Sequence, residues 1–336
     1  MASERPGAFS FAHTTLPFPK WQEAFRKELS RALGLDEIAR RGACPLAPER
    51  TSRVELEDHV REEFTIETEP GYRLAFYVLT PQTVRLPAPL VITPHGHGRY
   101  GKDTYAGIVH GEDDRRSMVE GERDIALQAV RAGYIAIAPD MRGFGATMPR
   151  EEREQGKSHS CRTMQMRALL FGRTLLGERV WDVMRVLDFA AAHLPVDMRR
   201  TAITGNSGGG TVALYAAAVD PRIAVSIPSC SFCALETSWG EIPHCECGYV
   251  PGIMNLGNMD DIAGLIAPRP LLIVAGEHDH LAPVESVKEA FTRTQAIYAA
   301  AGAADRCRLY VGPGGHRYYA APVWPFVAEW FLAPGG

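Results

Sequence analysis

The sequence predicts a single α/β domain built on a mostly parallel sheet, and three observations lead to this fold class. Short, continuous apolar runs of the kind that buried parallel strands require recur along the chain. Helical apolar patterns lie between most of these runs, so strands and helices alternate. The 336 residues are 46% hydrophobic and 23% charged, which is typical of a globular protein that buries a large core.

Residues 1–50 stand outside this alternation. Residues 1–19 contain several prolines and show no period, which predicts an irregular arm. Apolar residues then recur at every fourth position, on one face of an expected helix: Trp21, Phe25, Leu29 and Leu33. We therefore expect residues 1–50 to form an arm and a helix that pack on one main domain over residues 51–336.

We expect eight strands in the main domain. The first two, 54–66 and 72–79, flank a Pro-Gly turn and predict an antiparallel hairpin. The other six are typical of buried parallel strands: 90–93, 134–138, 201–204, 223–227, 271–275 and 308–311. The clearest helical patterns are 121–131, 178–193, 208–219 and 284–300. Two long segments without a strand, 141–177 and 229–262, are expected to lie like lids over the carboxyl edge of the sheet, where ligands bind in this architecture.

A serine between glycines directly follows one of the buried strands. Residues 201–210 form a strand that turns into an apolar helix through the pattern Gly-x-Ser-x-Gly. Because the flanking residues lack side chains, the chain can turn sharply and project Ser207 beside the helix N-terminus. Ser207 is therefore the candidate nucleophile. The alternative is an ordinary turn with a serine near a helix N-cap.

A carboxylate and a histidine follow the last two predicted strands, in the chain order that a Ser-Asp-His triad requires. Asp279 lies just beyond residues 271–275, and His316 lies in the glycine-rich loop after residues 308–311. A histidine can take the serine proton, and an aspartate can hold the imidazole and offset its developing charge. Two alternatives stay open: Glu277 is the acid, or His316 is a hydrogen-bonded loop histidine.

The segment His95-Gly96-His97-Gly98 follows the first parallel strand, where this arrangement draws half of its oxyanion hole. Its glycines let the backbone approach a substrate carbonyl, and we assign the donors to the backbone N–H groups of His97 and Gly208. In the alternative, His95 and His97 are metal ligands or surface residues. In the segment 229–262, the candidate pocket residues are Trp239, His244 and Tyr249.

We expect no metal and no other cofactor. The run His244-Cys245-Glu246-Cys247 could form half of a zinc site, but Cys-x-Cys without a second matching pair is a weak signal. A metal-dependent hydrolase that uses the cluster Glu277-His278-Asp279-His280 is a further alternative.

Taken together, these motifs resemble the α/β-hydrolase superfamily, and within it the dienelactone-hydrolase-like and acetyl xylan esterase-like carboxylesterases. The resemblance is carried by His95-Gly96-His97-Gly98, by residues 138–145, by the 205–210 turn, by residues 276–279 and by Gly314-Gly315-His316. It implies an α/β-hydrolase fold with an eight-stranded, mostly parallel sheet and an N-terminal helical extension. Dienelactone hydrolases proper use a cysteine nucleophile, so Ser207 favours an esterase. Acetyl xylan esterases of this type carry a tyrosine where His97 stands.

The expected function is hydrolysis of carboxylic esters with short, acetyl-like acyl groups through an acyl-enzyme, because both lid segments are rich in polar residues. The same triad would also serve a thioester, peptide or lactone hydrolase, and the fold could be a catalytically silent binding protein. The net charge of −4 and the lack of a Lys/Arg-rich block disfavour nucleic acid and anionic membranes. Seven cysteines and no secretory pattern over residues 1–18 predict a cytoplasmic protein. The expected partner is a small-molecule ester, and a homo-oligomer is left open.

Overall fold

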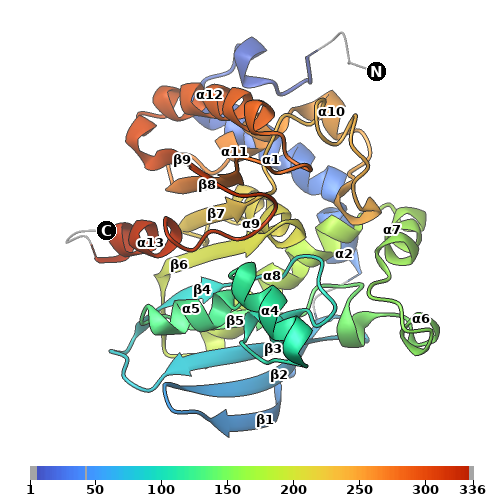
Figure 1. Cartoon of the computed structure of the whole chain (residues 1–336). Coiled ribbons are helices and arrows are strands. Elements are labelled where there is room, and N and C mark those ends of the chain that lie inside the picture. The colour runs from blue at the N-terminus through green and yellow to red at the C-terminus, as the bar shows by residue number, and fades with distance from the viewer. Residues whose placement is uncertain (1–5, 42–43, 333–336) are drawn as a thin grey trace.

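The computed structural model describes residues 6–41 and 44–332. The strands within this part of the chain are β1 Glu49–Glu55, β2 His59–Glu69, β3 Tyr72–Pro81, β4 Ala88–Ile92, β5 Ile135–Pro139, β6 Val196–Asn206, β7 Val225–Ser229, β8 Leu271–Gly276 and β9 Cys307–Gly312. They form one nine-stranded sheet in the order β1-β2-β3-β5-β4-β6-β7-β8-β9 (Figure 1). The pairings from β1 to β5 are antiparallel, and those from β5 through β4 to β9 are parallel. The predicted mostly parallel sheet with flanking helices is confirmed.

The described sheet has one strand more than the eight expected, because the predicted strand 54–66 is divided. β1 ends at Glu55, and β2 begins at His59 and pairs back along it. All seven residues of β1 are exposed, so this edge strand has no apolar face. A strand without a buried face leaves no hydrophobic period in the sequence, which explains why the pattern did not reveal it.

Helices cover both faces of the sheet. One face packs against α1 (Phe18–Leu33), α8 (Leu175–His193), α9 (Gly208–Val219) and α12 (Val284–Ala300), and the other against α5 (Ile125–Arg131) and α13 (Val323–Leu332). The shorter helices are α2 Leu35–Arg40, α3 Lys102–Tyr105, α4 Glu112–Glu120, α6 Arg150–Glu154, α7 Cys161–Leu170, α10 Ile253–Leu256 and α11 Met259–Gly264. Strand residues alternate between the two cores: Leu90 and Ile92 lie in one, and Val91 lies in the other. The sequence of a strand that is buried on both faces is therefore a continuous run of apolar residues.

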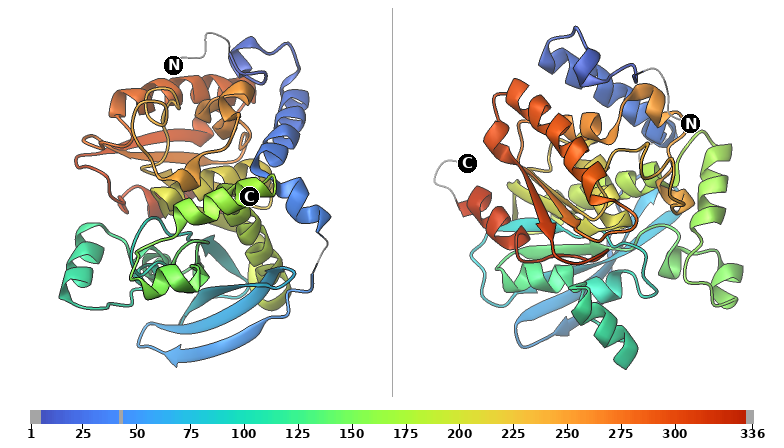
Figure 2. Two further views of the ribbon diagram at one scale, coloured as in Figure 1. Left: turned by 90° about the vertical axis from the view of Figure 1, so that its right-hand side faces the viewer. Right: turned by 45° about the horizontal axis from the view of Figure 1, so that its top comes forward.

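The N-terminal helix α1 lies beside elements from the second half of the chain (Figure 2). Its four predicted apolar residues are fully buried, which agrees with the four-residue period. Polar residues of α1 also bind the main domain, since Gln22 Nε2 donates to Ala267 O at 2.7 Å and Arg26 Nε donates to Ala218 O at 2.9 Å. Apolar packing and hydrogen bonds thus both hold α1 in place. Among the described helices, none combines the length and the apolar character that crossing a membrane requires.

Candidate active site

Ser207 stands at the junction of β6 and α9, in a conformation that non-glycine residues rarely adopt. Its φ is 57° and its ψ is −125°. The turn packs tightly against the loop after β4: a Cβ atom at Gly205 would lie 2.4 Å from Pro94 O, and one at Gly209 would lie 2.0 Å from the same oxygen. Side chains at both positions are therefore excluded, and the Gly-x-Ser-x-Gly pattern is a steric requirement of this turn.

Asp279 and His316 form a direct pair at the ends of β8 and β9. His316 Nδ1 lies 2.8 Å from Asp279 Oδ2 and 3.0 Å from Oδ1. Asp279 is 4% exposed and also accepts a hydrogen bond from the backbone N–H of Leu281 at 2.9 Å, whereas Glu277 is exposed. Burial acts to raise the pKa of Asp279, but the hydrogen bond and charge of His316 outweigh it and lower that pKa. The buried carboxylate therefore stays ionised beside the imidazole.

Ser207 and His316 line the same cavity, which has a volume of about 790 Å³. The loop after β4 forms part of its wall and lies against the serine turn, because a Cβ atom at Gly96 would lie 2.5 Å from Asn206 O. A Cβ atom at Gly208 would lie 3.3 Å from His97 Nδ1, so the two residues predicted as oxyanion donors are neighbours. The structure thus brings the five residues of the predicted triad and oxyanion hole to one edge of the sheet.

His95 has a different position from His97. It is 2% exposed, and its Nε2 accepts a hydrogen bond from the backbone N–H of Met141 at 2.9 Å. This bond ties the loop after β4 to the loop after β5. His95 is therefore neither a surface residue nor a member of a metal-ligand cluster within the described part of the chain.

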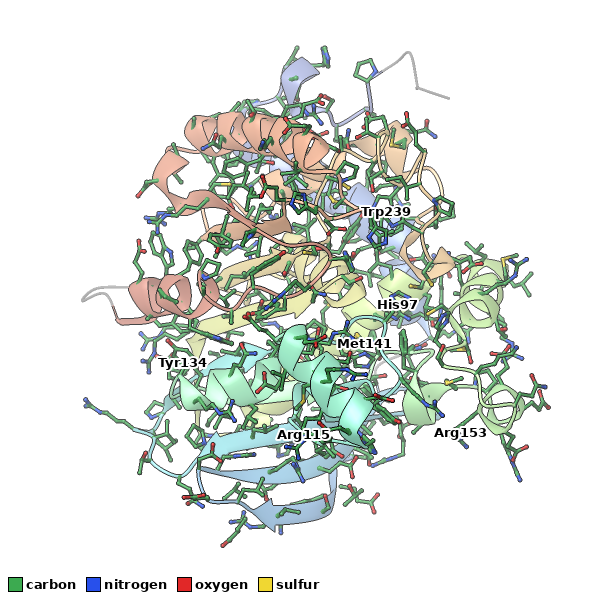
Figure 3. All side chains as sticks on the ribbon, viewed as in Figure 1. His97, Arg115, Tyr134, Met141, Arg153 and Trp239 are labelled. Carbon is green, nitrogen blue, oxygen red and sulfur yellow. The ribbon has the colours of Figure 1, made fainter. Side chains whose placement is uncertain are left out.

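Two of the three predicted pocket residues line the cavity with Ser207. Trp239 and His244 stack with ring centroids 4.2 Å apart and an interplanar angle of 12°, and His244 Nε2 lies 2.9 Å from Ser238 Oγ. Figure 3 marks Trp239 and His97, which both border this cavity. Tyr249 lines a neighbouring cavity of about 550 Å³ instead, and Trp239 borders both.

The cavity wall comes from more of the chain than the two expected lid segments. Segment 229–262 supplies many lining residues, and segment 141–177 supplies Leu176. The segment 98–123, which contains α3 and α4, adds charged and aromatic groups that no sequence motif indicates: Arg99, Tyr100, His110, Glu112, Asp113, Asp114 and Arg123. The long interval without a strand between β4 and β5 is the sequence signal that could have identified it.

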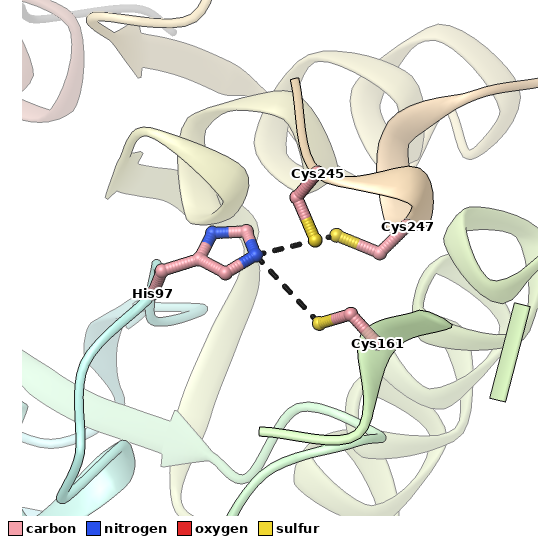
Figure 4. Close-up of side chains that lie close together, drawn as sticks. All are labelled: His97, Cys161, Cys245 and Cys247. Carbon is pink, nitrogen blue, oxygen red and sulfur yellow. Dashed lines mark hydrogen bonds between the residues drawn. The ribbon is translucent and has the colours of Figure 1, made fainter. Parts of the chain in front are cut away.

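A cluster of one imidazole and three thiols lies at the loop after β4 (Figure 4). His97 Nε2 is 3.6 Å from Cys161 Sγ and 3.5 Å from Cys247 Sγ. With Cys245 Sγ, all four atoms lie within 4.8 Å of one another. The sequence pattern groups Cys245 and Cys247 with His244, but His244 stacks on Trp239 and is not one of these four residues. His97 and Cys161 were not linked to the other cysteines because they lie far away in the sequence.

The strand order, the serine turn after β6, the acid after β8 and the histidine after β9 define an α/β-hydrolase. The predicted superfamily and fold are confirmed.

The chain belongs to the Abhydrolase family, whose sequence profile matches residues 2–297. A Bacillus subtilis (strain 168) protein named "Putative hydrolase YtaP" is 30% identical over 294 residues, which cover 87% of this chain and 92% of that protein. The crystal structure of a "putative acetyl xylan esterase" from Bacteroides fragilis NCTC 9343 aligns with a TM-score of 0.74 at 20% identity, over 92% of this chain and 79% of that one. A glucuronoyl esterase from Solibacter usitatus aligns with a TM-score of 0.68 at 17% identity, over 98% of both chains. At these identities the two structures support the fold.

Proposed function

We propose that this protein is a serine esterase that cleaves carboxylic esters through an acyl-enzyme intermediate. One arrangement carries the proposal: Ser207 projects from a strained turn into the cavity that His316 also lines, and the buried Asp279 carboxylate holds His316 Nδ1. The names of the two structural relatives, an acetyl xylan esterase and a glucuronoyl esterase, point to the same reaction class.

In this proposal each group has a role in the reaction. His316 Nε2 accepts the Ser207 hydroxyl proton while Ser207 Oγ bonds to the ester carbonyl carbon. The resulting oxyanion accepts hydrogen bonds from the backbone N–H groups of His97 and Gly208. The alkoxide then leaves and takes the proton from His316, which leaves an acyl group on Ser207. A water molecule repeats these steps and releases the acid, while Asp279 stays ionised throughout.

The cavity supports a substrate with a small acyl group and a polar alcohol. Its wall carries guanidinium groups from Arg99 and Arg123 and carboxylates from the N-terminal turn of α4, beside the aromatic ring of Trp239. Such a surface offers hydrogen bonds and one stacking platform, as a hydroxylated alcohol such as a sugar requires. These charged groups interrupt the apolar part of the wall, which disfavours a long acyl chain.

A burst experiment with an activated acetate ester tests the mechanism. We expect rapid release of about one equivalent of alcohol per active site, followed by slower turnover, and a wild-type chain that gains the mass of one acetyl group. Ser207→Ala is the control and should show neither the burst nor the added mass. A wild-type protein without a burst and without acylation would identify a catalytically silent member of the fold. Faster acylation by a matched thioester, peptide or lactone would reassign the scissile bond.

We also propose a cytoplasmic location. This proposal is supported by the seven cysteines, because none of them forms a disulfide, as is typical of proteins in a reducing compartment.

A further inference from the structure

We propose that His97, Cys161, Cys245 and Cys247 bind one structural zinc ion. Thiolate sulfur and imidazole nitrogen are the donors that zinc prefers in closed, four-coordinate sites, and three cysteines with one histidine are an established combination. The four residues come from three separate parts of the fold: the loop after β4, the start of α7 and the segment between β7 and α10.

The observed distances match the edges of a zinc tetrahedron. With Zn–S near 2.3 Å and Zn–N near 2.0–2.1 Å, a tetrahedral angle places the nitrogen about 3.6 Å from each sulfur. His97 Nε2 lies 3.6 Å from Cys161 Sγ and 3.5 Å from Cys247 Sγ, which agrees with this edge length. Since all four donor atoms lie within 4.8 Å of one another, a single ion could contact all of them with small side-chain shifts.

The surroundings supply the charge that such a site needs. Zn²⁺ with three thiolates has a net charge of −1, and the buried Arg179 places Nη2 3.4 Å from Cys161 Sγ. The Arg179 guanidinium otherwise donates to Arg142 O, and within residues 6–41 and 44–332 it forms no salt bridge with a carboxylate. A buried cation without a carboxylate partner is costly unless another anion is present. The thiolates of the proposed site are that anion.

Zinc would replace the protons on the thiols and on the coordinating nitrogen of His97, as metal binding to cysteine and histidine does generally.

Four protein ligands leave no open position on the ion, so its role would be structural. The ion would tie segment 229–262 and α7 to the loop that carries the His97 backbone N–H. The effect on catalysis therefore rests on the proposed esterase function, because it acts through the position of this oxyanion donor. The metal site itself is independent of that function.

Metal analysis of the full chain tests the site directly. Protein expressed with zinc in the medium and purified without chelators or a polyhistidine tag should contain about one zinc per chain. We expect the variants Cys161→Ser and Cys247→Ser to lose most of the bound zinc. Cys307→Ser, which changes a buried cysteine in β9 outside the cluster, is the matched control and should retain it. A wild-type protein that holds no zinc, and binds none after reduction and addition of Zn²⁺, would overturn the proposal.

Cobalt substitution gives a readout that needs no variant. Co²⁺ in the wild-type chain should produce the intense visible bands of a tetrahedral ion and thiolate-to-metal charge-transfer absorption. The spectrum of an octahedral ion, or a disulfide between two of the three cysteines in freshly purified protein, would contradict the site. Because neither measurement uses turnover, an inactive protein with bound zinc would refute only the esterase proposal. An active protein without a zinc site would refute only this inference.

Discussion

At the scale of single residues, the backbone of Ser207 carries a conformational cost. A non-glycine residue in this region is strained by about 1–3 kcal/mol, and its φ of 57° is imposed by the close packing of the turn against Pro94. Such strain persists where the position of a side chain matters more than stability. Here the side chain is the hydroxyl of Ser207, which lines the same cavity as His316.

Replacing Ser207 by glycine should therefore stabilise the fold while it removes turnover. Glycine relieves the strain but has more freedom in the unfolded chain, so we expect a net gain of about 1 kcal/mol and a rise in Tm of a few degrees. Turnover should fall by a factor on the order of 10⁴ to 10⁶. Ser207→Ala is the control, because alanine keeps the strain and should lose activity without gaining stability. Equal melting temperatures for the two variants would show that the turn is not strained.

Asp279 and Glu277 form a natural matched pair, because only the first is buried against His316. Asp279→Asn should lower kcat by a factor on the order of 10⁴, since an amide favours the wrong imidazole tautomer and cannot stabilise the imidazolium. Glu277→Gln should leave kcat nearly unchanged. The kcat values of the two variants, measured under steady-state conditions, show which of the two carboxylates is the acid of the triad. If the larger loss belongs to Glu277→Gln, the acid of the triad has been misassigned.

At the scale of elements, the N-terminal arm is anchored by a buried carboxylate at the start of α11. Asp261 Oδ1 accepts a hydrogen bond from Phe11 N at 2.7 Å, and Oδ2 accepts one from Asn258 N at 2.9 Å. Burial and the neighbouring Asp260 raise the pKa of Asp261 to about 7, although these two N–H donors and Arg293 oppose the shift. The folded protein thus keeps a proton on Asp261 at pH values where the unfolded chain has lost it.

This linkage predicts that the contribution of Asp261 to stability falls as the pH rises. Below the unfolded pKa of about 4, both states are protonated and the contribution is complete. Between about pH 4 and 7 the folded state binds more protons, so the free energy of unfolding decreases by up to about 1.4 kcal/mol per pH unit. Asp261→Asn should remove this slope in urea unfolding between pH 5 and 7. Asp305→Asn, an exposed carboxylate in the same chain, should preserve it. Parallel curves for the wild type and Asp261→Asn would refute the assignment.

Elements differ in how well the sequence predicts them, and the extent of their apolar runs explains the difference. The predicted bounds of β5 and β8 agree within one residue at each end, because every residue of these strands is buried. The bounds of the edge strand β9 agree as well, because Leu309, Tyr310 and Val311 form an apolar run although they are only half-buried. The strand β6 was predicted over 201–204 but extends from Val196 to Asn206, since its first residues are half-exposed and lack an apolar run. The helix α13 was missed: Pro325 lies in its first turn, where proline is tolerated, and reads as a break in the sequence.

The prediction of the site from sequence also depends on whether a local pattern marks each residue. The predicted triad stands at strand ends, and since the carboxyl ends of parallel strands share one edge, chain order alone brings Ser207, Asp279 and His316 together. The cluster of His97 with three cysteines depends on how two long segments without strands fold over that edge. No local period or motif encodes that path, so Cys161 could not be paired with Cys245 and Cys247 from sequence.

At the scale of the whole molecule, the cavity walls should set the acyl-chain preference. The catalytic cavity is lined by charged groups from segment 98–123, and burying a methylene against them gains little of the roughly 0.8 kcal/mol that an apolar wall would provide. We therefore expect kcat/KM on p-nitrophenyl esters to be greatest for acyl chains of two to about four carbons. A maximum at eight or more carbons would contradict this reading of the cavity.

Trp239 lies between the catalytic cavity and the second cavity, so a substitution at this position should change the acyl-chain preference. The ring packs on Gly248, where a Cβ atom would lie 2.0 Å from it, and it borders both cavities. The second cavity carries a set of apolar side chains beside the carboxylates of Glu236, Glu241 and Glu246: Met166, Leu169, Leu235, Met254 and Met259. Trp239→Ala should join the two spaces and let longer acyl chains reach this surface. Each further methylene buried there would then raise kcat/KM by about fourfold, the equivalent of 0.8 kcal/mol.

The same ester series, run on Trp239→Ala and on Tyr249→Phe, isolates the effect of the indole. Tyr249 lines the second cavity, and its hydroxyl donates to Trp239 O at 3.3 Å, so Tyr249→Phe removes this bond but keeps the indole wall and should leave the optimum at short chains. For Trp239→Ala we expect the optimum to move to longer chains while the acetyl ester keeps a comparable kcat, because Ser207, Asp279 and His316 lie outside the changed wall. A uniform loss on every ester would mean that Trp239 holds the catalytic loops in place. An unchanged optimum would mean that the two cavities do not communicate through this residue.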